Sequence, residues 1–336
     1  MLLSLLLAGL AAGSLSAQEP KPAPKKILVT GRGISYIPDM KILAPNVTFV
    51  EAKADGMIAQ IADADAFLGE ITPPLFQAAK KLKWVHIYSA GVERSRFPEF
   101  INSNVALTNG KIIQGPEIAD HAFALLLSLT RNIVQAIPNR AKEEWPKSDW
   151  KAIELRGKTA LIIGVGGIGS QIATRAAAFG MTVIGVDPKD VPFHPAISQV
   201  VPPDRIDSVI PKADVVFVSA PHTPQSEKMV GAKQFDLMKR GAYFIAVSRG
   251  KLYDTNALVK ALDSKRIAGA GLDVTDPEPL PKGHALWKFD NVVLTPHIAT
   301  VSDGVGERYR ELVLDNVARF AKGEPLRNVV DKVKGY

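Results

Sequence analysis

The sequence predicts an α/β fold of two domains, each with a parallel sheet covered by helices. Short apolar, β-branched runs alternate with stretches of helical periodicity, first over residues 27–108 and again over 159–294. Such alternation is typical of parallel sheets with crossover helices. The length of 336 residues allows two domains of about 150 residues each. The content of 46% hydrophobic and 22% charged residues excludes a disordered or fibrous protein.

The composition also excludes several chemistries. The chain has no cysteine, which rules out disulfides, thiolate nucleophiles, iron–sulfur clusters and cysteine-ligated zinc. Its six histidines are scattered, so we expect no metal site. The net charge of +7 favours anionic small molecules. Lysine and arginine form no long cluster along one segment, so we expect no nucleic-acid partner.

The N-terminal segment has the pattern of a signal peptide. Residues 1–17 are uncharged, rich in leucine and alanine, and end in small residues. Residues 18–26 contain three prolines and are expected to form a linker. We therefore expect export to the periplasm or the medium, with no transmembrane domain in the mature chain. The alternatives are an uncleaved membrane anchor and a cytoplasmic protein whose start site is assigned too far upstream.

The first alternating block predicts four strands and two helices. Each helix has apolar residues three and four positions apart, so it can cover one face of a sheet. The expected strands are 27–30, 47–50, 66–69 and 84–87, and the expected helices are 57–62 and 75–82. The block ends near Thr108.

A long helix is expected to follow this block. Gly115-Pro116-Glu117 suits a helix start, because proline fits the first turn and an acid stabilises the N-terminus. We expect the helix to run to about Ile137. Its segment 122–129 is apolar on nearly every side, which predicts burial between layers or at a subunit interface.

The second alternating block predicts six further strands. Several of these runs are apolar on both faces, as central strands of a parallel sheet must be. The expected strands are 159–164, 182–186, 214–218, 242–247, 268–272 and 292–294. An amphipathic helix at 305–322 and a short tail at 329–333 complete the chain.

A glycine-rich turn opens the second block and predicts a Rossmann nucleotide site. Its residues are Gly164, Val165, Gly166, Gly167, Ile168 and Gly169, between an expected strand and a helix at 170–179. Gly164 permits the tight turn, Gly166 lets the backbone approach a pyrophosphate, and Gly169 lets helix and strand pack closely. The helix N-terminus then holds the negative charge of the phosphates.

The end of the next strand predicts which dinucleotide binds. Asp187 lies there, 18 residues after Gly169. A carboxylate in this place binds the ribose hydroxyls of adenosine and repels a 2′-phosphate. NAD is therefore expected over NADP, although Lys189 nearby works against that preference.

Three later strand ends carry motifs with polar residues, where doubly wound sheets bind their ligands. They read Val247-Ser248-Arg249-Gly250, then Gly271-Leu-Asp273-Val-Thr-Asp-Pro-Glu278-Pro, then Thr295-Pro-His297. With the glycine turn, these motifs closely resemble the D-isomer-specific 2-hydroxyacid dehydrogenase family. The resemblance covers residues 26–328.

This resemblance implies roles for individual residues. Arg249, Glu278 and His297 match the catalytic residues of the family, and Asp273 matches an aspartate that holds the nicotinamide carboxamide. Further cofactor contacts are implied for Pro221, Thr223, Val247 and Ser248. A substrate loop that receives the carboxylate on its backbone N–H groups is implied for Ser89, Ala90, Gly91 and Val92. Tyr88 before it either shapes the pocket or packs against the sheet.

The chemistry agrees with these residue types. Reduction of a 2-oxo acid needs a proton at the nascent alkoxide, and an imidazole such as that of His297 titrates near neutral pH. Glu278 would orient the ring and favour its protonated form. Arg249 would pair with the substrate carboxylate. Glyoxylate, hydroxypyruvate, pyruvate and bulkier 2-oxo acids all remain open as substrates.

The resemblance also implies an architecture. A flavodoxin-like substrate domain would comprise residues 27–114 and 303–336, and an NAD-binding Rossmann domain residues 115–302. A homodimer built on the long helix is implied as well. The alternative function is that of an NAD-dependent scaffold of the same fold, similar to the corepressor relatives of the family, without significant turnover.

Overall fold

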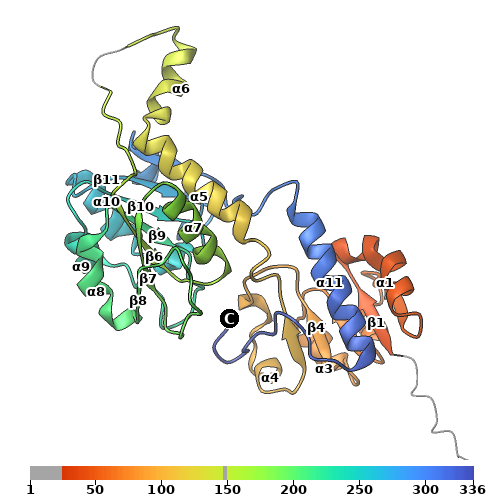
Figure 1. The fold of residues 1–336 in the computed structure, drawn as a ribbon. Helices are drawn as coiled ribbons and strands as arrows, with labels where there is room; N and C mark the ends of the chain where they lie inside the picture. The colour runs from red at the N-terminus through yellow and green to blue at the C-terminus, as the bar shows by residue number, and fades with distance from the viewer. Residues whose placement is uncertain (1–24, 147–149) are drawn as a thin grey trace, which may run out of the picture.

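The computed structural model describes residues 25–146 and 150–336. The expected signal peptide and most of the expected linker lie outside these residues. The chain forms two lobes side by side, each built on a parallel sheet (Figure 1). No helix in the described ranges is both long and apolar enough to cross a membrane.

The first lobe has a five-stranded parallel sheet in the order β2-β1-β3-β4-β5. Its strands are β1 (Lys26–Val29), β2 (Thr48–Glu51), β3 (Ala66–Leu68), β4 (Trp84–His86) and β5 (Ala106–Thr108). Its helices are α1 (Ile37–Leu43), α2 (Met57–Ile61), α3 (Pro73–Ala78), α4 (Pro98–Ile101) and α11 (Val305–Lys322), with 3-10 turns at Gly31–Tyr36 and Glu93–Ser95. One face packs against α1 and α11, and the other against α2, α3 and α4.

The second lobe has a seven-stranded parallel sheet in the order β12-β11-β10-β9-β6-β7-β8. Its strands are β6 (Thr159–Ile163), β7 (Thr182–Val186), β8 (Gln199–Val201), β9 (Val215–Val218), β10 (Ala242–Ala246), β11 (Ile267–Leu272) and β12 (Val292–Leu294). Its helices are α5 (Gly115–Thr130), α6 (Ile133–Ala141), α7 (Gly167–Ala178), α8 (Ile206–Val209), α9 (Ala232–Leu237) and α10 (Thr255–Asp263). Short 3-10 turns lie at Pro203–Arg205, Ile210–Lys212, Gly250–Leu252 and Ala285–Lys288.

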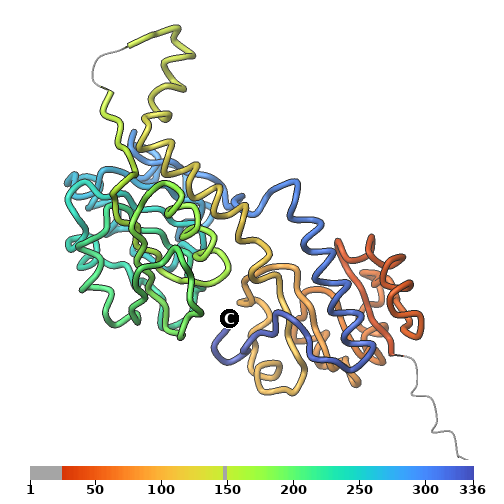
Figure 2. The backbone as a smooth tube through the Cα atoms, viewed as in Figure 1, coloured from red at the N-terminus to blue at the C-terminus, as the bar shows by residue number. Residues whose placement is uncertain are grey.

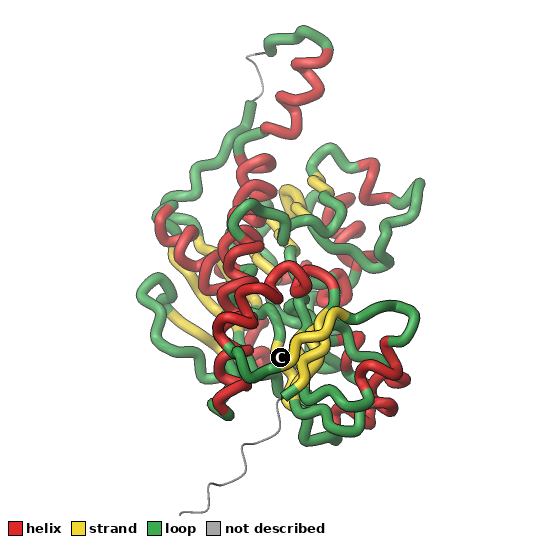
Figure 3. The backbone as a smooth tube through the Cα atoms, turned by 90° about the vertical axis from the view of Figure 1, so that its right-hand side faces the viewer, coloured by secondary structure: helices red, strands yellow, loops and turns green. Residues whose placement is uncertain are grey.

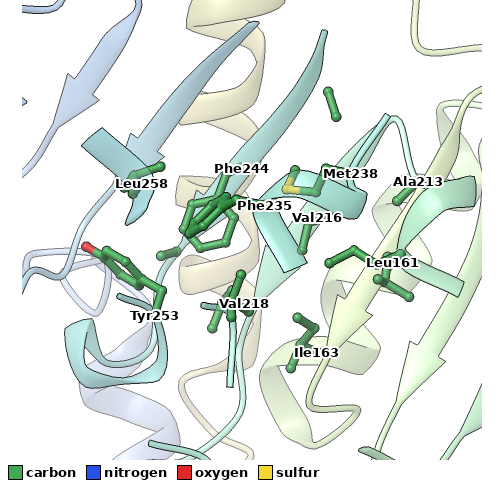
Figure 4. Packing of buried hydrophobic residues seen from close by; sticks show 14 of the residues in the cluster. Leu161, Ile163, Ala213, Val216, Val218, Phe235, Met238, Phe244, Tyr253 and Leu258 are labelled. Carbon is green, nitrogen blue, oxygen red and sulfur yellow. The ribbon is translucent and has the colours of Figure 1, made fainter. Parts of the chain in front are cut away.

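Two apolar layers hold the second lobe together. On one face of the sheet, α5 and α7 bury a cluster that includes Phe123 and Phe217, whose rings stack at 5.5 Å. On the other face, Phe235, Phe244 and their neighbours pack beneath α8, α9 and α10 (Figure 4). Because both faces are covered, the central strands are apolar throughout, as the sequence predicted.

The expected strands agree with the structure to within one or two residues. β1 begins at Lys26, one residue inside the expected linker. The helix expected at 75–82 begins earlier, at Pro73, and ends at Ala78. The sequence did not predict two strands, β5 and β8, or five of the helices, α1, α4, α8, α9 and α10.

The prediction of one long helix from 115 to about Ile137 is wrong in one respect, because this segment forms two helices, α5 and α6. Asn132 adopts a left-handed conformation with φ of 57°, which ends α5 and redirects the chain into α6. The apolar residues of α5 are buried within the chain, against the sheet and α7. By contrast, α6 projects from the second lobe and buries none of its residues (Figure 1).

The chain crosses between the lobes twice. It passes from β5 to α5, builds the second lobe, and returns from β12 into α11, which lies beside α1 (Figure 2). Seen from the side, helices lie against the strands of the molecule (Figure 3). The first lobe is therefore made from both ends of the described chain. The carboxyl ends of the strands in both sheets contribute loops to the space between the lobes.

Candidate active site

A cleft of about 1520 Å³ lies between the two lobes. Residues 89–91 line it from the first lobe, and residues 164–168 from the second. Another cavity, of about 600 Å³, lies at the amino ends of β10 and β11, and none of the predicted site residues lines it. The inter-lobe cleft is therefore the candidate site.

The glycine turn has the geometry that the sequence predicted. Gly164 has φ of 92°, and a Cβ there would lie 2.4 Å from the Cα of Ala220. A Cβ at Gly169 would lie 2.0 Å from the carbonyl oxygen of Gly164, so α7 packs directly on the end of β6. By contrast, a Cβ at Gly166 would meet no atom within 4 Å. Gly166 therefore faces open space at the N-terminus of α7, where a pyrophosphate fits.

Gly167 and Ile168 complete the turn and also line the cleft, whereas Gly169 lies behind it. A Cβ at Gly167 would approach the Cα of Ile112 to 2.5 Å, so this glycine lets the turn approach the connection from the first lobe. The turn is thus fixed against both lobes.

Asp187 lies at the carboxyl end of β7 and lines the cleft. Its Oδ2 accepts a hydrogen bond of 2.8 Å from the N–H of Val165 in the glycine turn, and its Oδ1 accepts one of 2.9 Å from the N–H of Lys189. These bonds hold the carboxylate beside the turn. That placement suits a ribose whose pyrophosphate lies over Gly166.

The loop after β9 is held by its own side chains. The hydroxyl of Ser226 donates to the carbonyl of Pro221 and accepts from the N–H of Thr223, both at 2.8 Å. Pro221 and Thr223 line the cleft, as do Val247 and Ser248 after β10. All four residues predicted from these two loops therefore face the same space.

Asp273 is a buried carboxylate at the end of β11. It accepts hydrogen bonds of 2.6 Å from the Thr295 hydroxyl, 2.9 Å from the N–H of Ile298 and 3.0 Å from the N–H of Ala299. Burial by itself raises the pKa of Asp273, but hydrogen bonds from His121, Thr295 and these two N–H groups bring it below its ordinary value. The carboxylate is therefore a fixed negative charge under the cleft.

His121 was not singled out from the sequence. It projects from α5, with its Nε2 2.9 Å from Thr295 Oγ1 and 3.4 Å from Asp273 Oδ1. Since the Thr295 hydroxyl donates to Asp273, its oxygen accepts from His121. The imidazole thus supports the Thr295–Asp273 pair. No motif marked this histidine, because it lies within an apolar helix remote in sequence from its partners.

His297 and Glu278 form the polar pair that the sequence predicted. Nδ1 of His297 lies 2.6 Å from Oε1 of Glu278, and both residues line the cleft. His297 adopts φ of 55°, an uncommon conformation for a residue with a side chain. With Nδ1 engaged, Nε2 is the ring atom left to hold or release a proton toward a bound molecule.

Arg249 approaches the first lobe across the cleft. Its Nε donates to Oε1 of Glu93 at 3.1 Å, and its Nη1 donates to the carbonyl of Ser248 at 2.7 Å. A Cβ at Gly91 would lie 1.9 Å from Nη2 of Arg249, so only glycine allows this approach. Glu93 belongs to the predicted substrate loop, but its pairing with Arg249 was not predicted, since that contact depends on how the lobes meet.

The remaining residues of the first-lobe loop divide into two groups. Ser89, Ala90 and Gly91 line the cleft, whereas the side chain of Val92 is buried in the core of the first lobe. Tyr88 takes the packing role of the two considered, edge-on to His86 and Tyr309. Burial raises the pKa of Tyr88.

The residues fit a dinucleotide better than a metal. The described part of the chain holds no group of three or more histidine, aspartate or glutamate side chains suited to a cation. The open space at Gly166, the N-terminus of α7 and the carboxylate of Asp187 match the pyrophosphate and ribose of a dinucleotide. Fold and cleft together define a two-lobed protein with a Rossmann nucleotide site.

Comparisons with known proteins place the chain more narrowly. The family model described as D-isomer specific 2-hydroxyacid dehydrogenase, NAD binding domain, matches residues 123–299. Glyoxylate reductase of Korarchaeum cryptofilum is 34% identical over 286 residues, which are 82% of this chain and 85% of that protein. D-3-phosphoglycerate dehydrogenase of Methanocaldococcus jannaschii is 33% identical over 82% of this chain, which spans 53% of that protein.

A solved structure agrees. The NADPH-dependent glyoxylate/hydroxypyruvate reductase of Sinorhizobium meliloti, in complex with NADP and sulfate, has a TM-score of 0.78 and 25% identity, covering 93% of this chain and 100% of that one. This chain therefore belongs to the D-isomer-specific 2-hydroxyacid dehydrogenase family of oxidoreductases.

Proposed function

We propose that the chain is an NAD-dependent enzyme that interconverts a 2-oxo acid and a D-2-hydroxy acid. The observation that carries this proposal is the convergence of the His297–Glu278 pair and Arg249 on the cleft that also holds the glycine turn. Separately, each of these side chains has ordinary structural explanations. Together, in one cleft, they match the requirements of hydride transfer to a carbonyl.

His297 is proposed as the general acid for reduction and the general base for oxidation. When bound, NADH supplies the hydride that reaches the carbonyl carbon. Nε2 of His297 gives a proton to the oxygen as negative charge develops there. Glu278 on Nδ1 fixes the ring orientation and stabilises the imidazolium before the proton leaves. In the oxidative direction the same nitrogen takes the hydroxyl proton.

Arg249 is proposed as the carboxylate-binding residue. In the structure its Nε pairs with Glu93, while Nη2 lies next to Gly91. The substrate carboxylate would take the Nη2 edge together with the backbone N–H groups of Ala90 and Gly91. A guanidinium in that position also polarises the neighbouring carbonyl.

The cofactor is proposed to be NAD, with NADP disfavoured. Asp187 supports this choice, because its carboxylate would meet the 2′-phosphate of NADP at close range. The relative from Sinorhizobium meliloti is described as NADPH-dependent, so the preference needs a direct test in this chain. The names of the relatives support small 2-oxo acids such as glyoxylate as the first substrates to try.

A homodimer and export are further proposals. The apolar part of α5 is already covered within the chain. Within the segment expected to form the dimer, α6 exposes two apolar residues, Ile133 and Ile137, and we propose that a second copy packs there. Export rests on the sequence of residues 1–17 alone, and N-terminal sequencing of the protein from fractionated cells tests it.

The test of function is NADH consumption by the purified chain with glyoxylate, hydroxypyruvate, pyruvate and a branched 2-oxo acid. We expect turnover with at least one of them. The variant His297→Gln should bind NADH normally and turn over at least about a hundredfold more slowly. Turnover unchanged in this variant would contradict the assigned mechanism. NADH binding without turnover on any acid would favour the scaffold alternative.

A further inference from the structure

The segment 331–336 reaches the cleft from the first lobe. Asp331 forms a turn in which its Oδ1 accepts from the N–H groups of Val333 at 3.0 Å and Lys334 at 2.9 Å. The turn closes with a hydrogen bond of 2.7 Å from the N–H of Gly335 to the carbonyl of Asp331. Residues 333–336 then line the cleft beside the end of β7 (Figure 1).

This segment is fixed to the first lobe. Nζ of Lys332 donates to the carbonyls of Phe100, Ser103 and Val105 at 2.7–2.8 Å, at the end of α4. Arg96 donates to the carbonyls of Lys332 at 3.1 Å and Val333 at 2.7 Å. The position of Tyr336 is therefore set by the first lobe.

Tyr336 nevertheless contacts the second lobe. The ammonium of Lys189 lies 4.0 Å from the centroid of its ring. Lys189 follows Asp187 by two residues, and its N–H donates to the Asp187 carboxylate. A cation over the face of a tyrosine ring is attracted by the electrons of the ring. The Lys189 ammonium therefore contacts Tyr336 of the first lobe, whereas the Lys189 backbone is part of the proposed ribose site in the second lobe.

We propose that Tyr336 is a specificity-determining residue of the nucleotide site, which holds Lys189 away from the position of an adenosine 2′-phosphate and so favours NAD over NADP. This inference rests on the dinucleotide site of the proposed function. Asp187 disfavours the 2′-phosphate by repulsion. Tyr336 would act differently, by keeping the Lys189 ammonium away from the 2′-phosphate that it could otherwise neutralise.

The other lysines that line the cleft near Asp187 already have partners of their own. Lys111 and Lys334 also line the cleft here, but Nζ of Lys111 donates to the Val329 carbonyl at 2.6 Å, and Nζ of Lys334 lies 3.8 Å from Asp331. Burial and the charge of Lys189 both lower the pKa of Lys111. Lys189 is thus the lysine whose backbone adjoins Asp187. Its ammonium lies against the Tyr336 ring and is also attracted by the Asp331 carboxylate of the same segment, whose pKa it helps to lower.

The experiment measures dissociation constants of NADH and NADPH for the full chain by nicotinamide fluorescence. Tyr336→Ala should bind NADPH about threefold more tightly, the effect expected of releasing one exposed cation–π contact, and NADH as before. Tyr336→Phe keeps the ring and should behave as the unaltered protein. Lys189→Ala combined with Tyr336→Ala should lose the gain in NADPH affinity. Melting temperatures check that each variant is folded.

The outcomes separate this inference from the proposed function. Failure of the unaltered chain to bind either dinucleotide would overturn both. NADH binding with an unchanged NADPH-to-NADH ratio in Tyr336→Ala would overturn the role of Tyr336 alone. Equal weakening of both cofactors would show a general packing role and would also overturn it. A gain in NADPH affinity that persists without Lys189 would exclude the lysine as the cause.

Discussion

Replacing either of two glycines in the same turn by alanine should affect different properties: stability for Gly169 and NADH affinity for Gly166. In Gly169→Ala the new Cβ would lie 2.0 Å from the carbonyl oxygen of Gly164, where ordinary contact needs about 3.5 Å. Both groups are backbone-fixed, so α7 and β6 must separate. Such overpacking costs up to about 3 kcal/mol, and the better helix propensity of alanine offsets about 1 kcal/mol. We expect a net loss of about 2 kcal/mol, or roughly 4–8 °C in melting temperature.

Gly166→Ala is the matched control, because its Cβ would meet nothing within 4 Å. The melting temperature should stay within about 1 °C, since substitutions without new contacts change stability little. NADH affinity should nevertheless fall at least about tenfold, because the methyl group occupies the place of the pyrophosphate. Differential scanning fluorimetry and nicotinamide fluorescence measure the two effects. Wild-type melting of Gly169→Ala, or wild-type NADH affinity of Gly166→Ala, would refute this reasoning.

Three further predictions concern other parts of the molecule. Asp187→Ala should raise kcat/KM with NADPH relative to kcat/KM with NADH. An unchanged ratio of the two values would mean that Asp187 does not contact the ribose. Burial lowers the pKa of His86 from 6.5 to about 3, so its contribution to stability is complete above pH 6.5 and decreases as the pH falls toward 3, by at most about 1.4 kcal/mol per pH unit. His86→Gln should therefore flatten the stability profile measured by urea unfolding across that range, and an equally steep profile would exclude His86 as its source. Ile137→Asp should halve the mass of a dimer in sedimentation, and an unaltered chain that sediments as a monomer would contradict a dimer through α6.

Most of the strands could be predicted because a strand buried on both faces of a sheet is apolar at successive positions, a pattern that is uncommon in other short segments. The glycine turn could be predicted for a similar reason, since Gly164 and Gly169 occupy places where a Cβ would collide with backbone. The break at Asn132 could not. Apolar spacing continues through it into Ile133 and Ile137, and asparagine tolerates the left-handed conformation without a glycine or proline to mark it.

Contacts between segments that are far apart in the chain could not be predicted from the sequence either. The motifs at Arg249, Glu278 and His297 each follow a strand, and they could be recognised because together they resemble the motifs of the family. The partner of Arg249 depends on how two lobes meet, and that placement brings Glu93 to it. His121 likewise acquires its role only when α5 is laid across the end of β11.

The return of α11 to the first lobe has a consequence for the order in which the protein can fold during synthesis. Val313, Val317 and Phe320 cover the face of the first sheet that contains Ile27 and Trp84, and the rings of Trp84 and Phe320 lie 5.2 Å apart. A ribosome makes these residues only after the whole second lobe. The second lobe, contiguous in sequence, can complete its core while one face of the first sheet is still exposed to water. The first lobe to be translated is therefore the last to be finished.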